Sequence, residues 1–326
     1  MDRTCNLIID SCCDLPFDAI NRPGVQLVKF PYFFEDVEFE DDMFRTLEAK
    51  VFYNRMRKGE QPTTAQASIV ALTSAFTAAA IQGTPTVYLC FSSGLSATYD
   101  QAVLVAEQIR GQYPDFELHV VDTRLASTAE ALLVFEALRQ QERGLTAAEM
   151  AAWAEEARNF VNVYFMVEDL DCLRRGGRIP ATVAVVGAKL DAKPILTIAT
   201  DGTLAVKGVA RGRKKGLRTL ADLYFDRADV TESQPYVCLG NADAEKDMKR
   251  LEEMILKEVE KNRAKPKEGM DGADLQVPLF IETSIGPVIG SHVGPGMVSL
   301  VFWGPDRREE ASVADRIARR IRRQQD

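Results

Sequence analysis

Residues Thr86-Val-Tyr-Leu-Cys-Phe-Ser-Ser-Gly-Leu-Ser-Ala-Thr-Tyr99 contain a short apolar run, a loop of serine and glycine, and the beginning of a helical pattern. The run Thr86–Phe91 is typical of a buried strand. After the loop, Ala102 and the apolar residues 3, 4 and 7 positions beyond it fall on one face of a helix. A strand that leads through a loop into a helix is the unit from which parallel α/β sheets are built, so this stretch predicts that architecture.

The same alternation of strand-like and helix-like segments continues through the first half of the chain. A helix face includes Ile69 and Leu72, and Thr146 with Glu149 has the spacing of a capping box that opens another helix. We therefore predict an N-terminal α/β domain with a parallel sheet over residues 1–160. Its other strand candidates are Asn6–Asp10, Val25–Phe34, Leu118–Asp122 and, at the boundary, Val161–Val167.

The second half of the chain has a different pattern. Two strand-like runs, Lys193–Ala199 and Thr203–Ala210, are separated by Asp201-Gly202, a strong hairpin signal, and a long helix carries Met248 and Leu251 on one face. These features predict a C-terminal α+β domain with a mixed or antiparallel sheet over residues 161–326. We also expect an exposed loop at Lys261–Gly272 and two strands at Gln276–Thr283 and Met297–Trp303. A basic helix from about Arg307 closes the chain.

Composition excludes several classes of function. The chain of 326 residues has a formal net charge of −8, which disfavours nucleic-acid binding and attraction to anionic membrane surfaces. No apolar run reaches the length of a signal peptide or a spanning helix, so we predict a cytoplasmic protein without stable membrane insertion. Two histidines and no Cys-x-x-Cys motif argue against a metal site, and adjacent Cys12 and Cys13 indicate buried packing more than a reactive thiol.

Two hydroxyl-rich segments predict a site for an anion. Ser96 is a candidate N-cap for the helix after strand Thr86–Phe91, and Thr64 in Pro62–Gln66 precedes the helix that carries Ile69. The loops beyond the carboxyl ends of parallel strands are where ligands bind, and helix N-termini there favour a carboxylate or phosphate. The simpler interpretation is two capped helices without a ligand.

A third polar candidate is His292, which stands between glycines in Val288-Ile-Gly-Ser-His-Val-Gly-Pro-Gly296. Glycines permit positive φ angles and close backbone approach, so we predict a turn that presents the imidazole to a bound group. The alternative is a Gly-Pro turn with an incidental histidine. The other histidine, His119, lies within a strand-like run, and we expect it to be structural.

Taken together and in order, these segments resemble the DegV family of bacterial fatty-acid-binding proteins. The resemblance runs from about Asp10 to about residue 300 and includes Asp10–Pro16 and Leu173–Ile179. It implies that Thr64 and Ser96 hold a fatty-acid carboxylate, that His292 belongs to the same polar end, and that the acyl chain lies in an apolar tunnel between the two domains. It further implies a carrier without a cofactor, which presents a long-chain fatty acid to a separate ATP-dependent fatty acid kinase that makes acyl phosphate.

The chain departs from the family pattern beside these positions. Ala65 stands where serine is usual, Ala67 where proline is usual, and Ala97 where glycine is usual. We include Ala97 and Thr63, the neighbours of Ser96 and Thr64, among the predicted ligand-binding residues.

The segment Leu173-Arg-Arg-Gly-Gly-Arg-Ile-Pro180 reads as a helix end with glycine stops, followed by a helix that starts near Pro180. Glycine stops do not account for Arg174, Arg175 and Arg178 in an acidic chain. The default explanation is a solvated helix face. The resemblance implies that some of these arginines dock the kinase or hold an acyl phosphate.

We predict a binding protein rather than an enzyme. No Gly-x-Ser-x-Gly, phosphate-binding loop or dinucleotide fingerprint follows a strand. The alternative that the residues leave open is a nucleophile pair of Ser96 and His292, as in an acyl hydrolase or acyltransferase, or an enzyme for a small anionic substrate at the same site.

Overall fold

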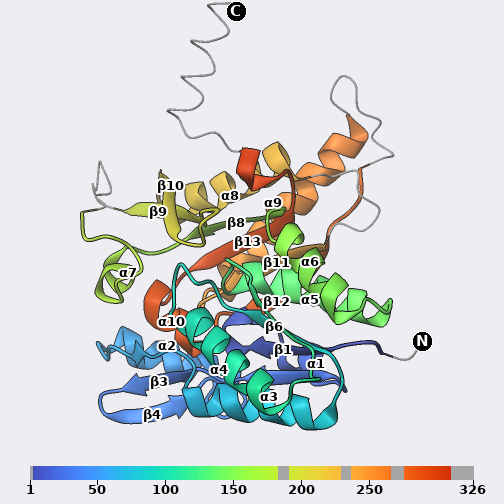
Figure 1. Cartoon of the computed structure of the whole chain (residues 1–326). Helices are drawn as coiled ribbons and strands as arrows, with labels where there is room; N and C mark the ends of the chain where they lie inside the picture. Colours follow the sequence, from blue (N-terminus) through green and yellow to red (C-terminus); the bar gives the residue numbers. More distant parts are fainter. Residues whose placement is uncertain (1–2, 183–190, 229–235, 266–274, 310–326) are drawn as a thin grey trace, which may run out of the picture.

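A computed structural model describes residues 3–182, 191–228, 236–265 and 275–309 (Figure 1). Much of the helix expected from Pro180, most of the loop Lys261–Gly272 and most of the basic closing helix lie outside these residues. At their described edges, helix α9 (Glu245–Ala264) continues to Ala264 where the sequence predicted a loop, and a 3-10 turn occupies Arg307–Glu309.

The predicted parallel sheet is confirmed as four strands in the order β2-β1-β6-β7, with every neighbouring pair parallel. Their bounds are β1 Asn6–Asp10, β2 Val25–Val28, β6 Thr86–Cys90 and β7 Leu118–Asp122. Helix α3 (Ile69–Gln82) packs beside β2 and against α4 (Thr98–Gln112), which packs on β7. Strands β1 and β6 are buried along their whole length, as expected for a parallel sheet inside a helical layer.

The single strand predicted over Val25–Phe34 is wrong. The chain leaves the parallel sheet after β2, and Pro31–Phe34 forms β3 of a separate antiparallel sheet with the order β4-β3-β5. The break falls at Phe30, whose N–H is taken by the Ser11 hydroxyl, and at Pro31, which has no N–H to donate to a ladder. The other two strands of this sheet are β4 Val37–Glu40 and β5 Thr63–Thr64.

The second half forms a mixed sheet, as predicted, in the order β10-β9-β8-β13-β11-β12. Only β11 and β12 run parallel to each other. The hairpin at Asp201-Gly202 is confirmed, with Gly202 at φ +85°, and β12 begins three residues later than predicted, directly after Pro278. The bounds are β8 Val161–Met166, β9 Ala192–Ile198, β10 Leu204–Arg211, β11 Tyr236–Asn241, β12 Leu279–Ser284 and β13 Val298–Trp303.

Helices connect and cover the two large sheets. The capping box of α6 is confirmed, because Thr146 and Glu149 each accept a hydrogen bond from the backbone N–H of the other. Figure 1 shows α8 and α9 above the six-stranded sheet and α5 below it, where α5 contacts β8, β11 and β13. The remaining helices are α1 Phe17–Ile20, α2 Ala49–Arg57, α5 Thr128–Glu142, α6 Ala147–Ala157, α7 Asp171–Arg175, α8 Arg213–Arg227 and α10 Pro287–Val293.

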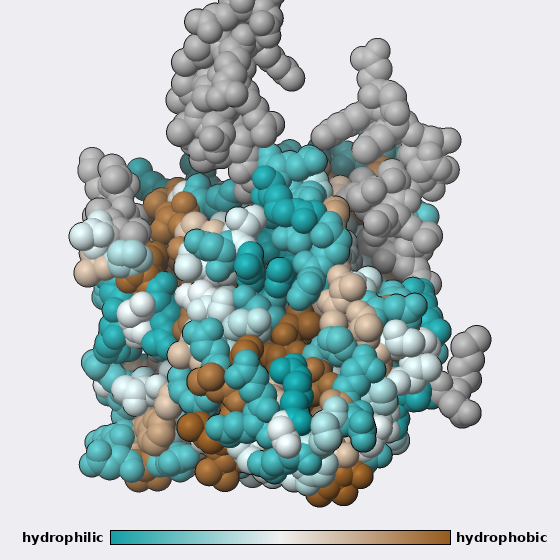
Figure 2. Space-filling model, in the orientation of Figure 1, coloured by the Kyte–Doolittle hydropathy of each residue, from teal (hydrophilic) through white to brown (hydrophobic). Residues whose placement is uncertain are grey.

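On the face shown in Figure 2, hydrophilic residues predominate and hydrophobic ones gather mainly in the lower part, where Figure 1 places α3 and α4. In the described part of the chain, no helix is both long and apolar enough to cross a membrane.

The tip of the β9–β10 hairpin contacts the loop that follows β6. The Ser92 hydroxyl donates to the Gly202 carbonyl at 2.9 Å, and a Cβ atom on Gly94 would lie 2.6 Å from the Gly202 carbonyl carbon. Only glycine permits this approach. The hairpin therefore joins the six-stranded sheet to the loop after β6, while the domain boundary near residue 160 stays a prediction.

Candidate functional site

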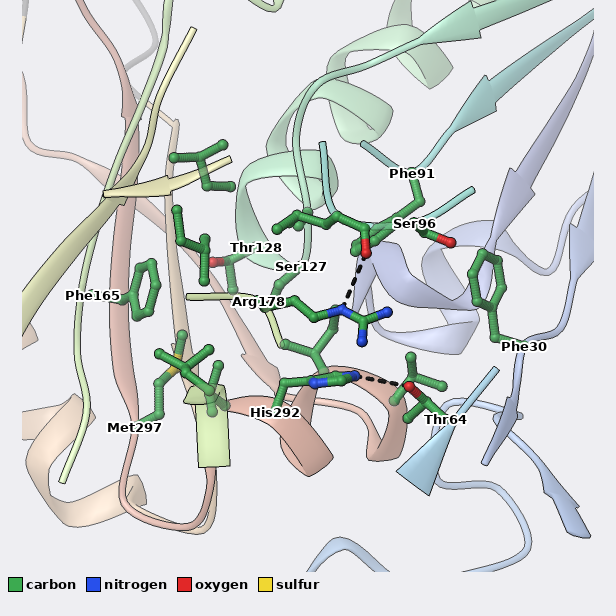
Figure 3. A pocket seen from close by; sticks show the side chains of 18 of the residues that line it. Phe30, Thr64, Phe91, Ser96, Ser127, Thr128, Phe165, Arg178, His292 and Met297 are labelled. Carbon is green, nitrogen blue, oxygen red and sulfur yellow. Dashed lines mark hydrogen bonds between the residues drawn. The ribbon is translucent and has the colours of Figure 1, made fainter. Parts of the chain in front are cut away.

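A cavity lies where the two large sheets, the small sheet and α10 meet (Figure 3). The empty space that its residues enclose, including the open mouth, is about 690 Å³. Most of its walls are apolar. The lining residues are Phe30, Thr64, Ala65, Phe91, Leu95, Ser96, Ala126, Ser127, Thr128, Val163, Phe165, Leu173, Arg178, Ile198, Leu204, Val288, Ile289, His292, Val293 and Met297.

Thr64 enters the cavity from β5. The expectation that it precedes a helix as a cap is wrong, because α3 begins at Ile69 with Ser68 as its N-cap and Thr64 pairs with Tyr32 in the small sheet. The strand carries the Thr64 hydroxyl to 2.8 Å from Nε2 of His292, which is 228 residues later in the chain. Thr64 and His292 are therefore brought together, as the family resemblance implied, although Thr64 lies on a strand and not at a helix cap.

Ser96 lies in the turn between β6 and α4 and faces the cavity. Ala97 is the N-cap of α4, so Ser96 stands one residue earlier than predicted. Its hydroxyl oxygen accepts from the Thr98 N–H at 3.2 Å and lies 2.9 Å from the Thr98 hydroxyl. The Thr98 hydroxyl in turn accepts from the N–H of Ala67. Thr98 is buried and joins the two hydroxyl-rich segments, but sequence reasoning did not single it out.

His292 lies on the last turn of α10 rather than on the predicted open turn. The glycines around it serve close packing: a Cβ on Gly290 would lie 2.5 Å from the Tyr53 hydroxyl, and one on Gly176 would lie 2.1 Å from Nδ1 of His292. Burial, reinforced by the positive charges of Arg178 and Arg175, lowers the pKa of His292 to about 4. The imidazole is therefore neutral near pH 7, and within the described residues its Nδ1 has no hydrogen-bond partner.

The three predicted docking arginines do not share one surface. Helix α7 ends as predicted, with Gly177 at φ +70°, and this reversal turns Arg178 into the cavity. The Arg178 guanidinium donates from Nε to the Leu95 carbonyl at 3.2 Å and from Nη1 to the carbonyl of Gly176, and burial lowers its pKa. Arg175 is exposed, and half-buried Arg174 lies 3.5 Å from Asp171.

Four polar side chains gather at one side of the cavity, where Phe30 and Phe91 also lie (Figure 3). The hydroxyls of Ser127 and Thr128, which line it as well, donate to Asp14 and Ser299. Figure 3 shows Thr64, Ser96, Arg178 and His292 around one region, with Phe165 and Met297 on the opposite side. Among the described residues that line the cavity, none carries a carboxylate. An anion at the polar end would thus meet hydroxyl groups, a neutral imidazole and one cation, without a like charge beside it.

The other predicted residues lie outside the lining. Thr63 and Ala97 are exposed and do not contribute to the cavity walls. His119 lies on β7 with Nε2 2.8 Å from a Glu117 carboxylate oxygen, away from the site. Cys12 and Cys13 are buried, and burial raises the pKa of both thiols, which favours the packing interpretation.

Ser96 and His292 do not form an activated nucleophile pair in this arrangement. The imidazole Nε2 is engaged by Thr64 and the Ser96 hydroxyl by Thr98. Nucleophilic catalysis by serine needs a base in hydrogen-bond reach, itself oriented by a third group. Within the described residues, no carboxylate fulfils that third role at His292.

Comparisons with known proteins agree with the resemblance in the sequence. The family described as "Uncharacterised protein, DegV family" matches residues 4–304. A DegV domain-containing protein of Clostridium perfringens is 32% identical over 91% of this chain and 97% of its own.

Two solved structures are similar over nearly the whole chain. A DegV lipid-binding protein of Thermotoga maritima has a TM-score of 0.75 at 27% identity and covers 93% of this chain and 99% of its own. A DegV protein of Thermus thermophilus, described for its fatty-acid binding, has a TM-score of 0.76 at 26% identity and covers 93% of this chain and 100% of its own.

Proposed function

The chain belongs to the DegV family, and from that membership we propose that it binds one long-chain fatty acid in the cavity between its two large sheets. The acid lies with its carboxylate among Thr64, Ser96, Arg178 and His292. Its acyl chain extends along the apolar walls. The relatives of Thermotoga maritima and Thermus thermophilus are described as lipid- and fatty-acid-binding, which supports the same ligand class here.

The observation that carries this proposal is the gathering of four polar side chains, Thr64, Ser96, Arg178 and His292, at one side of a mostly apolar cavity. A carboxylate buried without partners costs several kcal/mol, whereas each hydrogen bond to it contributes about 1.5–3 kcal/mol. Donors are therefore needed at one end only. Burial of each methylene of the acyl chain contributes about 0.8 kcal/mol to binding, so apolar walls suit the rest of the fatty acid.

Each residue at the polar end has a distinct part in the proposal. Thr64 and Ser96 donate hydroxyl hydrogens to the carboxylate, and Arg178 supplies the positive charge that offsets its own. His292 is neutral near pH 7, so it can donate one hydrogen bond from one ring nitrogen but adds no second positive charge. Arg178 thus moves, in this proposal, from the predicted docking surface to the ligand.

A kinase partner is the finer part of the proposal. The described lining of the cavity includes no nucleotide-binding loop, so acyl-phosphate formation would need a separate ATP-dependent kinase to reach the carboxylate. Arg175, exposed on α7 close to the polar end, is the cation of the three best placed to meet that partner. A cytoplasmic location would give the kinase access to ATP.

The proposal is tested by mass spectrometry of the organic extract of protein purified from a bacterial host. Wild type is expected to carry stoichiometric fatty acid, and the Thr64→Ala/Ser96→Ala double variant little. Thr63→Ala is the matched control, since it removes a neighbouring exposed hydroxyl outside the cavity. Wild-type protein that neither retains nor takes up oleic acid would refute the proposal.

A further inference from the structure

The first turn of α10, the helix that carries His292, begins against two buried carboxyl groups. Asp14 follows β1 and its short 3-10 turn, and Asp41 follows β4; both are at most 3% exposed. A Cβ atom on Gly286, the N-cap of α10, would lie 2.6 Å from Asp14 Oδ1 and 3.1 Å from Asp41 Oδ2. The two side chains therefore converge on one backbone position, which must be glycine to admit them.

The start of α10 approaches both carboxyl groups. The Gly286 N–H donates to Asp14 Oδ1 at 2.8 Å. The Val288 N–H is near enough to Asp41 to act against the rise of its pKa, while Asp41 Oδ2 has no hydrogen-bond partner among the described residues. Each carboxyl is also fixed by its own side of the molecule: the Ser127 hydroxyl donates to Asp14 Oδ2 at 2.6 Å, and the Met43 N–H donates to Asp41 at 3.0 Å. The pair thus connects the N-terminal half of the chain to the beginning of α10.

These contacts matter because α10 is too short to be stable without tertiary contacts. A helix of seven residues is not stable alone in water, so its position depends on tertiary anchors. The Tyr53 hydroxyl adds one further anchor, a 2.6 Å hydrogen bond to the Ile285 carbonyl. His292 lies at the other end of the same short helix, between Gly176 and Thr64, where small displacements would break its contact with Thr64.

The carboxyl groups are adapted to remain together. Burial raises the pKa of Asp41 to about 7 and that of Asp14 well above its usual range, and for Asp14 the nearby charge of Asp41 is the second cause. A proton on either carboxyl removes the repulsion that two nearby carboxylates would exert.

We propose that Asp14 and Asp41 are positioning residues of the binding site, which fix the first turn of α10 and thereby hold His292 beside Thr64. The role rests on the proposed function for its purpose, but the positioning itself concerns the protein without ligand. It is therefore measured separately from fatty-acid binding.

The experiment uses the imidazole signals of the ligand-free protein in a pH titration by NMR. The chain has two histidines, so exposed His119 is an internal reference for His292. In wild type, His292 should stay neutral down to a pKa of about 4, as set by burial and by facing Arg175 and Arg178. Asp14→Gly removes the carboxyl without straining the backbone, because Asp14 has φ +52°, and should raise the pKa of His292 by at least about one unit toward the ordinary ~6.5.

Three further variants complete the test. Asp41→Ala should shift His292 in the same direction, and Asp14→Asn should restore wild-type behaviour, because asparagine tolerates positive φ and still accepts from Gly286. Glu130→Gln is the matched control: it replaces another fully buried carboxyl, on α5, whose two oxygen atoms have no hydrogen-bond partner among the described residues. Oleate affinity should fall about tenfold in Asp14→Gly and Asp41→Ala, the loss expected from one hydrogen bond to a charged group.

An unchanged His292 titration in folded Asp14→Gly and Asp41→Ala would overturn the proposal. Hydrogen exchange on wild type gives a check that needs no variant: the amides of Gly286 and Val288 should be strongly protected, and exchange as fast as in exposed loops would also overturn it. If wild type binds no oleate while His292 still responds to Asp14→Gly, the proposed function fails and the positioning stands.

Discussion

The two ends of the cavity are built in different ways. At the polar end, Thr64, Ser96, Arg178 and His292 come from four short segments, none of which shares an element with another. At the apolar end, Val163 and Phe165 project from β8, and Ile198 and Leu204 from the β9–β10 hairpin, so a continuous sheet supplies the wall.

The supports behind the two ends differ as well. Buried carboxyl groups stand behind the polar end: Asp10 accepts from the Phe91 N–H at the start of the Ser96 turn, and Asp14 with Asp41 meets α10. The apolar end rests on hydrocarbon packing against α5 and the neighbouring strands. The contrast teaches that recognition of the head group depends on a few directed hydrogen bonds, whereas recognition of the tail depends on volume.

The largest effect is expected at the apolar end. Phe165→Ala should lower the free energy of unfolding by about 3–5 kcal/mol, because the side chain is only 4% exposed and its removal leaves a cavity. Denaturant unfolding measures this loss. The bound acyl chain, identified by mass spectrometry, should shift to greater length.

Phe165→Leu is the control, because it keeps most of the volume and should cost less than about 1.5 kcal/mol. If Phe165→Ala instead weakened the binding of oleic acid and left the binding of oleyl alcohol unchanged, Phe165 would contribute to head-group recognition. The assignment of tail recognition to the apolar end would then be wrong.

An intermediate effect is expected at the polar end. Arg178→Gln removes the only cation that lines the described cavity, and hydrogen bonds to charged groups contribute about 1.5–3 kcal/mol. Oleic acid should therefore bind about tenfold to a hundredfold more weakly by calorimetry. Oleyl alcohol, which has the same tail without the charge, should bind as it does to wild type.

Arg175→Gln removes a neighbouring exposed cation and should leave both affinities unchanged. Equal losses for the acid and the alcohol in Arg178→Gln would indicate that this arginine shapes the wall rather than holding the charge.

The smallest effect concerns the support behind the polar end. Burial raises the pKa of Asp10 from 3.8 to about 7, so the folded protein keeps this proton at a pH where the unfolded chain has lost it. The resulting stability is complete below about pH 4 and is lost as the pH rises to about 7. Between pH 5 and pH 6, the free energy of unfolding should fall about 1 kcal/mol more in wild type than in Asp10→Asn.

Denaturant unfolding at the two pH values measures this difference. Asp36→Asn, in the exposed turn between β3 and β4, should leave the wild-type pH dependence in place. A pH dependence in Asp10→Asn as steep as that of wild type would show that Asp10 is not protonated in the folded state.

Sequence reasoning reached the polar end more easily than the apolar one. The resemblance to the DegV family implied that Thr64, Ser96 and His292 belong together, and the patterns of strands and helices predicted both sheets. The predicted local structures were wrong where contacts between distant segments determine them. Thr64, for example, lies on a strand because it pairs with Tyr32.

The apolar end could not be found in the same way. Phe165 and Ile198 are apolar residues in apolar strands, and their sequence does not distinguish a side chain that faces a cavity from one that faces the core. Arg178 was recognised as unusual but assigned to a surface, because the reversal at Gly177 that turns it inward depends on how α7 packs.

The hydrogen bond between Thr64 and His292 also limits how early during synthesis the head-group site can form. A ribosome must add 228 residues after Thr64 before its partner exists. At ~5–20 residues per second that interval is about 10–50 s, during which the hydroxyl-rich segments have been made but the head-group site has no imidazole. A nascent chain can fold its parallel sheet early, yet it acquires the complete site only after His292 has been added.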